Sequence, residues 1–500
     1  MTKSIRIALF SILGLMLNAC GIPDLTSKQE DTQLPGTYGS GASHEGSSAN
    51  LRWNQLFDDP NLLQLIDVAV KNNKEVNIMM QRISVAENEI QARKGAYLPF
   101  VSLGAGADGQ KVGQYTRNGA VEENLDIKNG KAFPSFLGNF SFGLFSSWEI
   151  DIWKKLRNAT EVARLEYLAS MEGRRFLITN LVAEVAQAYY ELIALDNQLE
   201  NLEKNIEIQQ NALEVVKQLQ FYARTNSLAV KRYEAEVAKN TARNYEVKQQ
   251  ITVTENRINY LLGRTPQAIQ RRSSDFMNSK PKVLAVGIPS QLLKNRPDIR
   301  QAEFELSAAK LNIDVARANF YPSFGIKAGV GFEAFALKYL INTPESLAAT
   351  IAGELAAPLV NRNAIIADYK NASAKQIQAA YEYEQRIINA YTEVSNQLSN
   401  IANLDKDFER KGSQVDALTQ SIEIASQLFK SARTDYLDVL LTQRDTLEAK
   451  RELIETKLKQ YSATVELYRS LGGGWRDIED IANVASAEGE GSSGQLGPRR

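Results

Sequence analysis

The sequence of 500 residues contains one cysteine and one histidine. A single cysteine excludes a disulfide within the chain, and the two residues together cannot form a Cys/His zinc site. They also leave little for Cys–His or Ser–His–Asp catalysis. The net charge is −1, from 58 basic and 59 acidic residues, so no electrostatic feature favours binding to nucleic acid. We therefore expect a protein that is not an enzyme, holds no metal and has no nucleic-acid partner.

The first twenty residues predict the cellular location of the protein. Lys3 and Arg6 precede the apolar run 7–17, and small residues lead up to Cys20. This pattern is typical of a secretory signal peptide, and a run of about a dozen residues is too short to span a bilayer as a helix. The position of Cys20 resembles a bacterial lipobox, in which the cysteine is acylated. The alternative is a buried spare thiol. The predicted modification is a covalent lipid on Cys20, with no other cofactor.

An internal repeat organises the chain. Residues 212–230 and 421–439 are identical at eight of nineteen positions, at an offset of 209 residues. The same offset maps Leu262-Gly263 onto Leu471-Gly472, and further upstream Pro99 maps onto Pro322 at an offset of 223. Two tandem copies of one structural unit explain this better than two unrelated domains.

Each copy contains two segments in which apolar residues alternate with small or polar ones. The alternation is clear in 138–152 and 323–332, and weaker in 99–108 and 347–359. A period of two over about ten residues is typical of a transmembrane β-barrel strand, although a half-buried strand of a soluble sheet is the other interpretation. Because closing a barrel takes at least about eight strands, four strands predict an obligate oligomer.

Most of the chain has helical periodicity. Long helices are predicted at 155–222 and 361–430, with shorter partners at 228–262 and 437–471, and helical stretches at 60–95 and 297–318 precede the strands. Seams of Ala and Leu at heptad-like spacing indicate lateral coiled-coil packing. The predicted fold is mainly α, an elongated rod or tube of helices joined to a small membrane β-barrel.

Several motifs occur in order on this repeat. They are Trp148-Glu149-Ile150-Asp151-Ile152-Trp153, Gly287-Ile288-Pro289-Ser290, Arg296-Pro297-Asp298-Ile299 and Leu471-Gly472-Gly473-Gly474-Trp475. Over residues 51–476 the chain resembles the outer-membrane factor family, the TolC- and OprM-like lipoproteins (NodT type) of tripartite efflux pumps. In one departure, Lys154 follows the aromatic where the family usually has glycine. We expect no change of fold from it.

The resemblance implies a homotrimer with a 12-stranded β-barrel in the outer membrane, continued by a long periplasmic α-helical barrel. The implied function is a passive exit duct for drugs, toxic compounds or metal ions. The implied partners are a periplasmic adaptor protein, an inner-membrane pump of the resistance–nodulation–division (RND) class and outer-membrane lipid. A type I secretion exit channel is an alternative, and a surface coiled-coil scaffold without a pore is a further one.

The predicted domain boundaries follow from the repeat. They are a signal peptide at 1–19, an acylated tether at 20–50, a first repeat at 51–263, an inter-repeat equatorial segment at 264–296, a second repeat at 297–472, and an equatorial end with a flexible tail at 473–500.

Two turns of similar sequence, 223–226 and 432–435, join the long helices of each copy. Their plain structural interpretation is that Asn226 and Asp435 allow a tight turn and cap the next helix. In the family such turns form the periplasmic tip, and rings of like charge give pores their selectivity. We hypothesise that Arg433, Asp435 and Asp438 belong to a gate. The other tip residues of interest are Tyr436, Arg444, Arg224 and Asn226.

Overall fold

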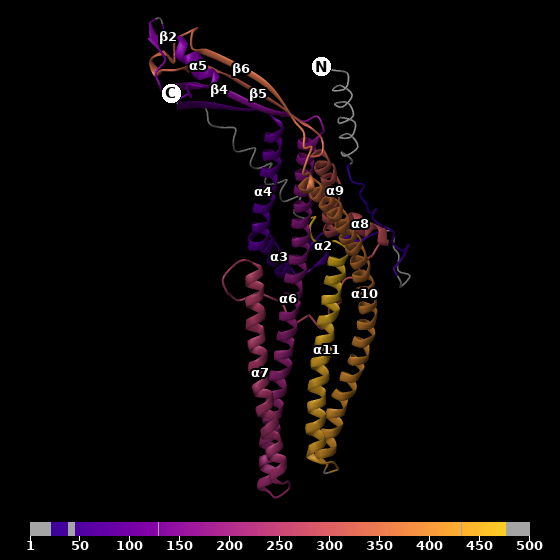
Figure 1. Cartoon of the computed structure of the whole chain (residues 1–500). Helices are drawn as coiled ribbons and strands as arrows, with labels where there is room; N and C mark the ends of the chain where they lie inside the picture. The colour runs from indigo at the N-terminus through magenta and orange to yellow at the C-terminus, as the bar shows by residue number, and fades with distance from the viewer. Residues whose placement is uncertain (1–21, 39–45, 129, 432, 477–500) are drawn as a thin grey trace, which may run out of the picture. The chain divides into compact units, whose positions relative to one another are not determined.

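The computed structural model describes residues 22–38, 46–128, 130–431 and 433–476, so Cys20 lies outside the described residues (Figure 1). The chain forms two compact units, and each contains parts of both sequence repeats. The first consists of Met1–Gln29, Ser84–Leu168 and Phe304–Tyr381, and the second of Glu30–Ile83, Ala169–Glu303 and Glu382–Arg500.

The first unit contains a four-stranded antiparallel sheet in the order β1-β4-β5-β6. Its strands are β1 (Phe100–Gln110), β4 (Leu137–Ile150), β5 (Ser323–Ala334) and β6 (Leu347–Ala356). The connection from β1 to β4 carries α5 (Arg117–Asn124) and a small hairpin of β2 (Asp126–Lys128) and β3 (Lys131–Ala132), and η3 (Leu337–Tyr339) lies between β5 and β6. The strands β1 and β6 are therefore the two edges of this sheet.

The register of the sheet gathers apolar side chains on one face. Leu103 pairs with Leu144, which pairs with Val330, and directly paired residues lie on the same face. These three side chains are 67%, 49% and 50% exposed. The opposite face is mostly small or polar, with Phe145 and Phe100 as exceptions, and on it Lys327 and Glu354 form an ion pair at 2.7 Å. One face of the sheet is thus apolar and uncovered within the described chain.

The turn from β4 into α6 (Lys155–Phe221) is built around a buried carboxylate. Asp151 accepts hydrogen bonds from the backbone amides of Leu156 and Arg157, both at 3.0 Å, and from Nε of Arg157 at 3.1 Å. Burial alone would raise the pKa of Asp151, but these bonds hold it below its usual value. Lys154 takes a left-handed backbone conformation with φ of +58°, which glycine adopts without a steric penalty.

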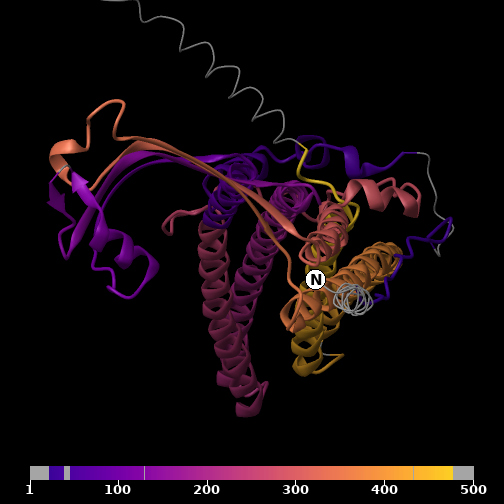
Figure 2. The same cartoon turned by 45° about the horizontal axis from the view of Figure 1, so that its top comes forward.

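The second unit is helical. Figures 1 and 2 show that α6 and α7 (Ser227–Leu261) run side by side as one hairpin, and α10 (Asn363–Lys430) and α11 (Tyr436–Ser470) as another. The helices α4 (Lys74–Tyr97), α6, α9 (Pro297–Ala318) and α10 each have residues in both units. The remaining elements are η1 (Ser48–Asn50), α2 (Trp53–Leu56), α3 (Pro60–Asn72), η2 (Pro289–Gln291) and α8 (Leu292–Asn295). Of the helices in the described segments, none is both long and apolar enough to cross a membrane.

The helical stretch expected at 60–95 is interrupted at Asn73, between α3 and α4. The side-chain oxygen of Asn73 accepts hydrogen bonds from the amides of Glu75 at 2.9 Å and Val76 at 3.1 Å. An asparagine that bonds to the amides ahead of it starts a new helix rather than continuing the old one.

The two hairpins share a seam of apolar side chains. Leu195 and Leu202 of α6, Val247 of α7 and Leu447 of α11 form one buried cluster. Its members come from both sequence repeats, so the repeats pack against one another instead of forming separate cores.

Part of the segment expected to be a tether is packed against helices. In the first unit, Ile22 and Leu25 contact a buried cluster that includes Phe320 and Tyr369. The hydroxyl of Ser373 donates to the carbonyl of Thr26 at 2.8 Å. In the second unit, the ring of Tyr38 stacks on that of Tyr391 with centroids 5.6 Å apart. Residues 22–38 thus form a strap along α10, where Ile22 and Leu25 are partly buried and Tyr38 is buried.

Candidate functional site

The turn between α6 and α7 ends the first helix with a left-handed residue. Ala223 has φ of +55°, and the amide of Arg224 donates to the carbonyl of Leu219 at 2.8 Å. This is the Schellman arrangement, in which glycine usually occupies the left-handed position. In the second hairpin the amide of Arg433 donates to the carbonyl of Leu428 at 2.9 Å, so the two turns share this bond.

The predicted capping residues differ between the tips. The side chain of Asn226 accepts a hydrogen bond from the amide of Ala229 at 3.1 Å and caps α7. Asp435 occupies the same position before α11, but its side chain makes no capping bond within the described residues. The capping role is therefore confirmed for Asn226 and is wrong for Asp435.

The charged residues predicted at the tips are exposed. Arg224, Arg433, Asp435, Asp438 and Arg444 all lie at the surface of the described chain. The carboxylate of Asp438 accepts a hydrogen bond from the hydroxyl of Thr434, and Arg444 bonds to the adjacent Asp445 at 3.0 Å. Exposure leaves the two acids and Arg433 available to another copy of the chain.

Tyr436 differs from the other tip residues because it is buried, at 8% exposure. Its ring lies 4.5 Å from that of Tyr233 and 5.3 Å from that of Phe429. Tyr233 belongs to α7 and is fully buried in the same apolar cluster. This aromatic contact joins the two hairpins near their tips. Sequence reasoning missed Tyr233, because a tyrosine at an apolar helix position carries no further signal.

The motif Arg296-Pro297-Asp298 forms a buried ion network. Arg296 is 3% exposed and binds Asp298 through Nε at 3.0 Å and Nη2 at 2.7 Å. It also binds Glu393 at 2.7 Å and the carbonyl of Ser470 at 3.1 Å. Burial alone would lower the pKa of Arg296, but the bonds to Asp298 and the charge of Glu393 raise it above its usual value.

The first repeat has a simpler version of this joint. Asn73 corresponds to Arg296 at the offset of 223, and its amide nitrogen donates to the carbonyl of Leu261 at 2.9 Å. Leu261 corresponds to Ser470 at the offset of 209. Both copies therefore hold the end of the returning helix through its carbonyl, with an amide in one and a guanidinium in the other.

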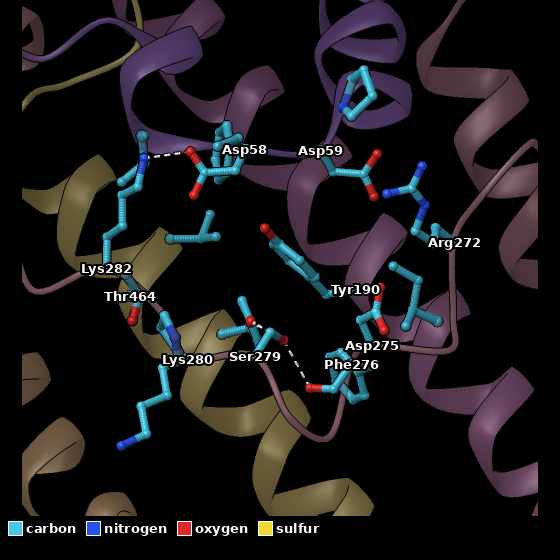
Figure 3. A pocket seen from close by; sticks show the side chains of 17 residues that line it. Asp58, Asp59, Tyr190, Arg272, Asp275, Phe276, Ser279, Lys280, Lys282 and Thr464 are labelled. Atoms are coloured by element: carbon cyan, nitrogen blue, oxygen red, sulfur yellow. Dashed lines mark hydrogen bonds and ion pairs between the residues drawn. The ribbon is translucent and has the colours of Figure 1, made fainter.

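A cavity of about 250 Å³ lies where the inter-repeat segment crosses α6 and α11 (Figure 3). Its floor is a stack of aromatic rings: Tyr461 lies 4.4 Å from Tyr190 and 5.5 Å from Phe276. Asp58 and Lys282 face each other on one side of the cavity at 2.6 Å, and Asp59 and Arg272 lie on the other side.

The groups around this cavity already bond to one another. Tyr461 donates to the hydroxyl of Ser279 at 2.5 Å, and Lys457 donates to the carbonyl of the same residue. Burial lowers the pKa of Lys457. These contacts fix the inter-repeat segment to α11. In the part of the chain that the structure describes, no group of three His, Cys, Asp or Glu side chains could hold a metal ion.

Comparison with known proteins identifies the family. Residues 65–264 and 288–473 match the family described as outer membrane efflux protein. The pyoverdine export outer membrane protein OpmQ of Pseudomonas putida is 28% identical over 93% of this chain and 96% of its own length. The cation efflux system protein CusC of Escherichia coli is 28% identical over 85% of this chain and 89% of its own length.

The fold has also been seen in a solved structure. The open state of the MtrE outer membrane channel of Neisseria gonorrhoeae superposes with a TM-score of 0.79, covering 91% of this chain and 98% of that one at 22% identity. The expected fold class, helices combined with a sheet as in these outer-membrane channels, is thereby confirmed. The chain belongs to the outer membrane efflux protein family.

Proposed function

We propose that this outer-membrane channel component of an efflux pump acts as a homotrimeric exit duct. One observation carries the proposal: the sheet has an uncovered apolar face and two edge strands, β1 and β6. An unpaired strand edge in hydrocarbon costs several kcal/mol for each bare amide or carbonyl. Three chains that join β1 to β6 of the next copy leave no edge and turn the apolar face to lipid.

The duct works with a periplasmic adaptor and an inner-membrane RND pump, and it conducts passively. One relative is named for pyoverdine export and another for cation efflux. We propose a cargo of the same breadth, small organic solutes, toxic compounds or metal ions. A passive duct needs no binding site for what it conducts. The side chains around the cavity between the inter-repeat segment, α6 and α11 already bond to one another, so this cavity fits a structural joint.

The chain is held to the outer membrane by acyl groups on Cys20 as well as by its strands. The strap supports this arrangement, because Ile22 and Leu25 are fixed in the first unit, which also contains the sheet. Acyl chains contribute about 0.8 kcal/mol per buried methylene group.

The gate lies at the tip of the second hairpin. Arg433, Asp435 and Asp438 are exposed there, and in a trimer three copies of Asp438 form a ring that favours cations. Ion pairs from Arg433 to acids of a neighbouring copy hold the tip closed.

Single-channel conductance in planar bilayers, with the oligomer mass measured on the same sample, tests this function. We expect a trimer with a small cation-selective conductance that rises severalfold in Arg433→Ala and Asp438→Ala. The matched control is Arg224→Ala at the equivalent position of the first tip, which should change the conductance less. A monomer without conductance would exclude the duct, and unchanged conductance in both gate variants would exclude only the gate.

A further inference from the structure

All four connections between strands and helices lie at one end of the sheet in the first unit. The strands β1 and β5 begin there, after α4 and α9, and β4 and β6 end there, before α6 and α10. Two indole rings lie at this junction end. Trp148 donates from its ring nitrogen to the carbonyl of Tyr97 at 3.1 Å, and Trp153 donates to the carbonyl of Pro322 at 2.7 Å. Both rings are partly exposed while their N–H groups are satisfied, which is typical of side chains at the boundary between lipid and water.

A groove lies beside Trp153, between the end of β4 and the start of β5. The ring of Trp153 stacks on that of Tyr321, with centroids 4.6 Å apart. The groove has a volume of about 390 Å³, and both rings line it together with Lys155. Its lining therefore combines a pair of stacked aromatic rings with a cation, all within the first unit.

Two lysines beside these rings have no acidic partner in the chain. Lys154 is exposed and Lys155 is half-buried, and neither forms an ion pair within the segments that the structure describes. Asp151 also lines the groove, but its charge is neutralised by Arg157 at 3.1 Å. The two ammonium groups therefore give this edge of the groove an unbalanced positive charge.

The first of these lysines is held in a strained conformation. Lys154 has φ of +58°, where glycine has no steric penalty and a residue with a Cβ does. The corresponding left-handed residue before α10 is Asn361, which is uncharged and adopts this conformation readily. Strain that persists at one residue indicates a function for its side chain. In Lys154 the feature that glycine and asparagine lack is the ammonium group.

The proposed lipid anchor begins close to the same end of the sheet. Ile22 packs against the buried cluster that contains Phe320, the residue next to Tyr321 of the stacked pair. Only Gly21 separates Ile22 from Cys20, the proposed acylation site. In the proposed duct the strands span the membrane, so their junction end lies at the periplasmic surface, where the acyl chains of Cys20 also enter the bilayer.

We propose that Trp153, Tyr321, Lys154 and Lys155 bind the headgroup of an anionic phospholipid in the periplasmic leaflet of the outer membrane. The two ammonium groups donate to the phosphodiester oxygens, as charge-assisted hydrogen bonds. The stacked rings lie against the glycerol and the first methylene groups of the acyl chains. This inference rests on the proposed function, because it requires the sheet to span the membrane.

One acid in the groove gives the proposal a test of sign. Glu149 lines the groove and forms no ion pair within the described residues. Its carboxylate repels a phosphodiester, so Glu149→Gln should strengthen the binding of an anionic lipid while the lysine variants weaken it. A groove that held lipid through apolar contact alone would respond to neither charge.

Native mass spectrometry of the purified full chain, with short-chain phosphatidylglycerol or phosphatidylcholine added, measures the binding. The wild type should prefer phosphatidylglycerol. Lys154→Gly and Lys155→Gln should each weaken its binding about fivefold, the scale of one lysine near an anionic membrane surface, and leave that of phosphatidylcholine unchanged. The matched control is Asn361→Gly at the second junction, which should leave the binding of both lipids unchanged.

Thermal unfolding separates a lost lipid contact from a damaged fold. Without lipid, Lys154→Gly should unfold at a higher temperature than the wild type, because the backbone strain is relieved. With phosphatidylglycerol, the same variant should gain less in its unfolding midpoint than the wild type does. A variant that merely folded badly would have a lower midpoint in both conditions.

Three results would overturn the site. They are equal binding of the two lipids by the wild type, full binding of phosphatidylglycerol by Lys154→Gly/Lys155→Gln, and displacement of the lipid by inorganic phosphate at the same concentration, which would indicate a site for a free anion. In a trimer that conducts, each of them leaves the proposed function standing. A monomer without conductance would overturn the proposed function, and with it the membrane placement that the lipid site requires.

Discussion

The two copies of the repeat have the same backbone arrangement at the end of the returning helix. They differ in the side chain that bonds to that end. Gly263 and Gly472 end the returning helices with φ of +67° and +86°, and in both a Cβ would lie 2.4 Å from a backbone carbonyl oxygen, of Asn72 or Asn295. Beside these glycines the first copy has Asn73 and the second Arg296. The glycine sets the close approach, and the neighbouring side chain sets how strongly the joint is held.

The largest expected effect concerns the stability of the two joints, and removing the side chain of the second joint should cost more than removing that of the first. Arg296→Ala leaves the buried carboxylate of Asp298 without its cation, and breaking a buried pair typically costs about 3–5 kcal/mol. Asn73→Ala removes a helix cap and one hydrogen bond, which costs about 0.5–2 kcal/mol. Thermal unfolding followed by circular dichroism in detergent measures both. Equal losses would show that the two joints are equivalent.

The capping difference between the tips gives the next effect. Asn226→Ala should lower the free energy of unfolding by about 1 kcal/mol, because it removes the bond to the amide of Ala229. Asp435→Ala should change it by less than about 0.5 kcal/mol, since no capping bond is lost. Hydrogen exchange at the first turns of α7 and α11 locates each effect, and a larger loss in Asp435→Ala would contradict the assignment.

The junctions before α6 and α10 offer a matched pair of left-handed residues. Lys154 has φ of +58° and Asn361 has φ of +54°. Lys154→Gly should raise the stability by about 0.5–1 kcal/mol, because a side chain with a Cβ is strained in this conformation. Asn361→Gly should leave it nearly unchanged, since asparagine adopts this conformation readily. The midpoint of thermal unfolding for each variant decides, and a gain only in Asn361→Gly would reverse the comparison.

The smallest effect is a dependence on pH that only the first junction has. The pKa of Asp151 is depressed in the folded chain, so its contribution is complete above the unfolded value of about 3.9 and is lost as the pH falls through the folded value. Residues 356–363 before α10 contain no acid. The difference in unfolding midpoint between wild type and Asp151→Asn should therefore shrink below about pH 4. A difference independent of pH would exclude this role.

Much of the fold could be predicted because the apolar period of a long segment can be read from neighbouring residues. That period indicates a helix or a strand and which of its faces is apolar. The turn between α6 and α7 lies where Asn226 follows a helix without proline, and the alternation around Leu144 and Val330 specifies which face of the sheet is apolar. The strand predicted at 347–359 ends earlier, at Ala356, because Pro358 cannot continue the ladder. Membership in a family of channels also confirms that the chain is not an enzyme.

The rest depends on contacts that no local pattern contains. Arg296 meets Glu393 across 97 residues of sequence, and Tyr233 meets Tyr436 only because two hairpins pack together. The left-handed conformation of Ala223 has no signal in its residue type. The roles of Arg433, Asp435 and Asp438 in a gate remain predictions, because charge selectivity belongs to an assembly of several chains.

The strap of residues 22–38 has a consequence for the order of events during export. Its hydrogen bonds to Ser373, Gln376 and Glu384 close loops of 347, 348 and 353 residues, so the strap leaves the ribosome long before its docking surface is made. Contacts of such high sequence separation form late. The strap must therefore remain undocked until α10 has been synthesised.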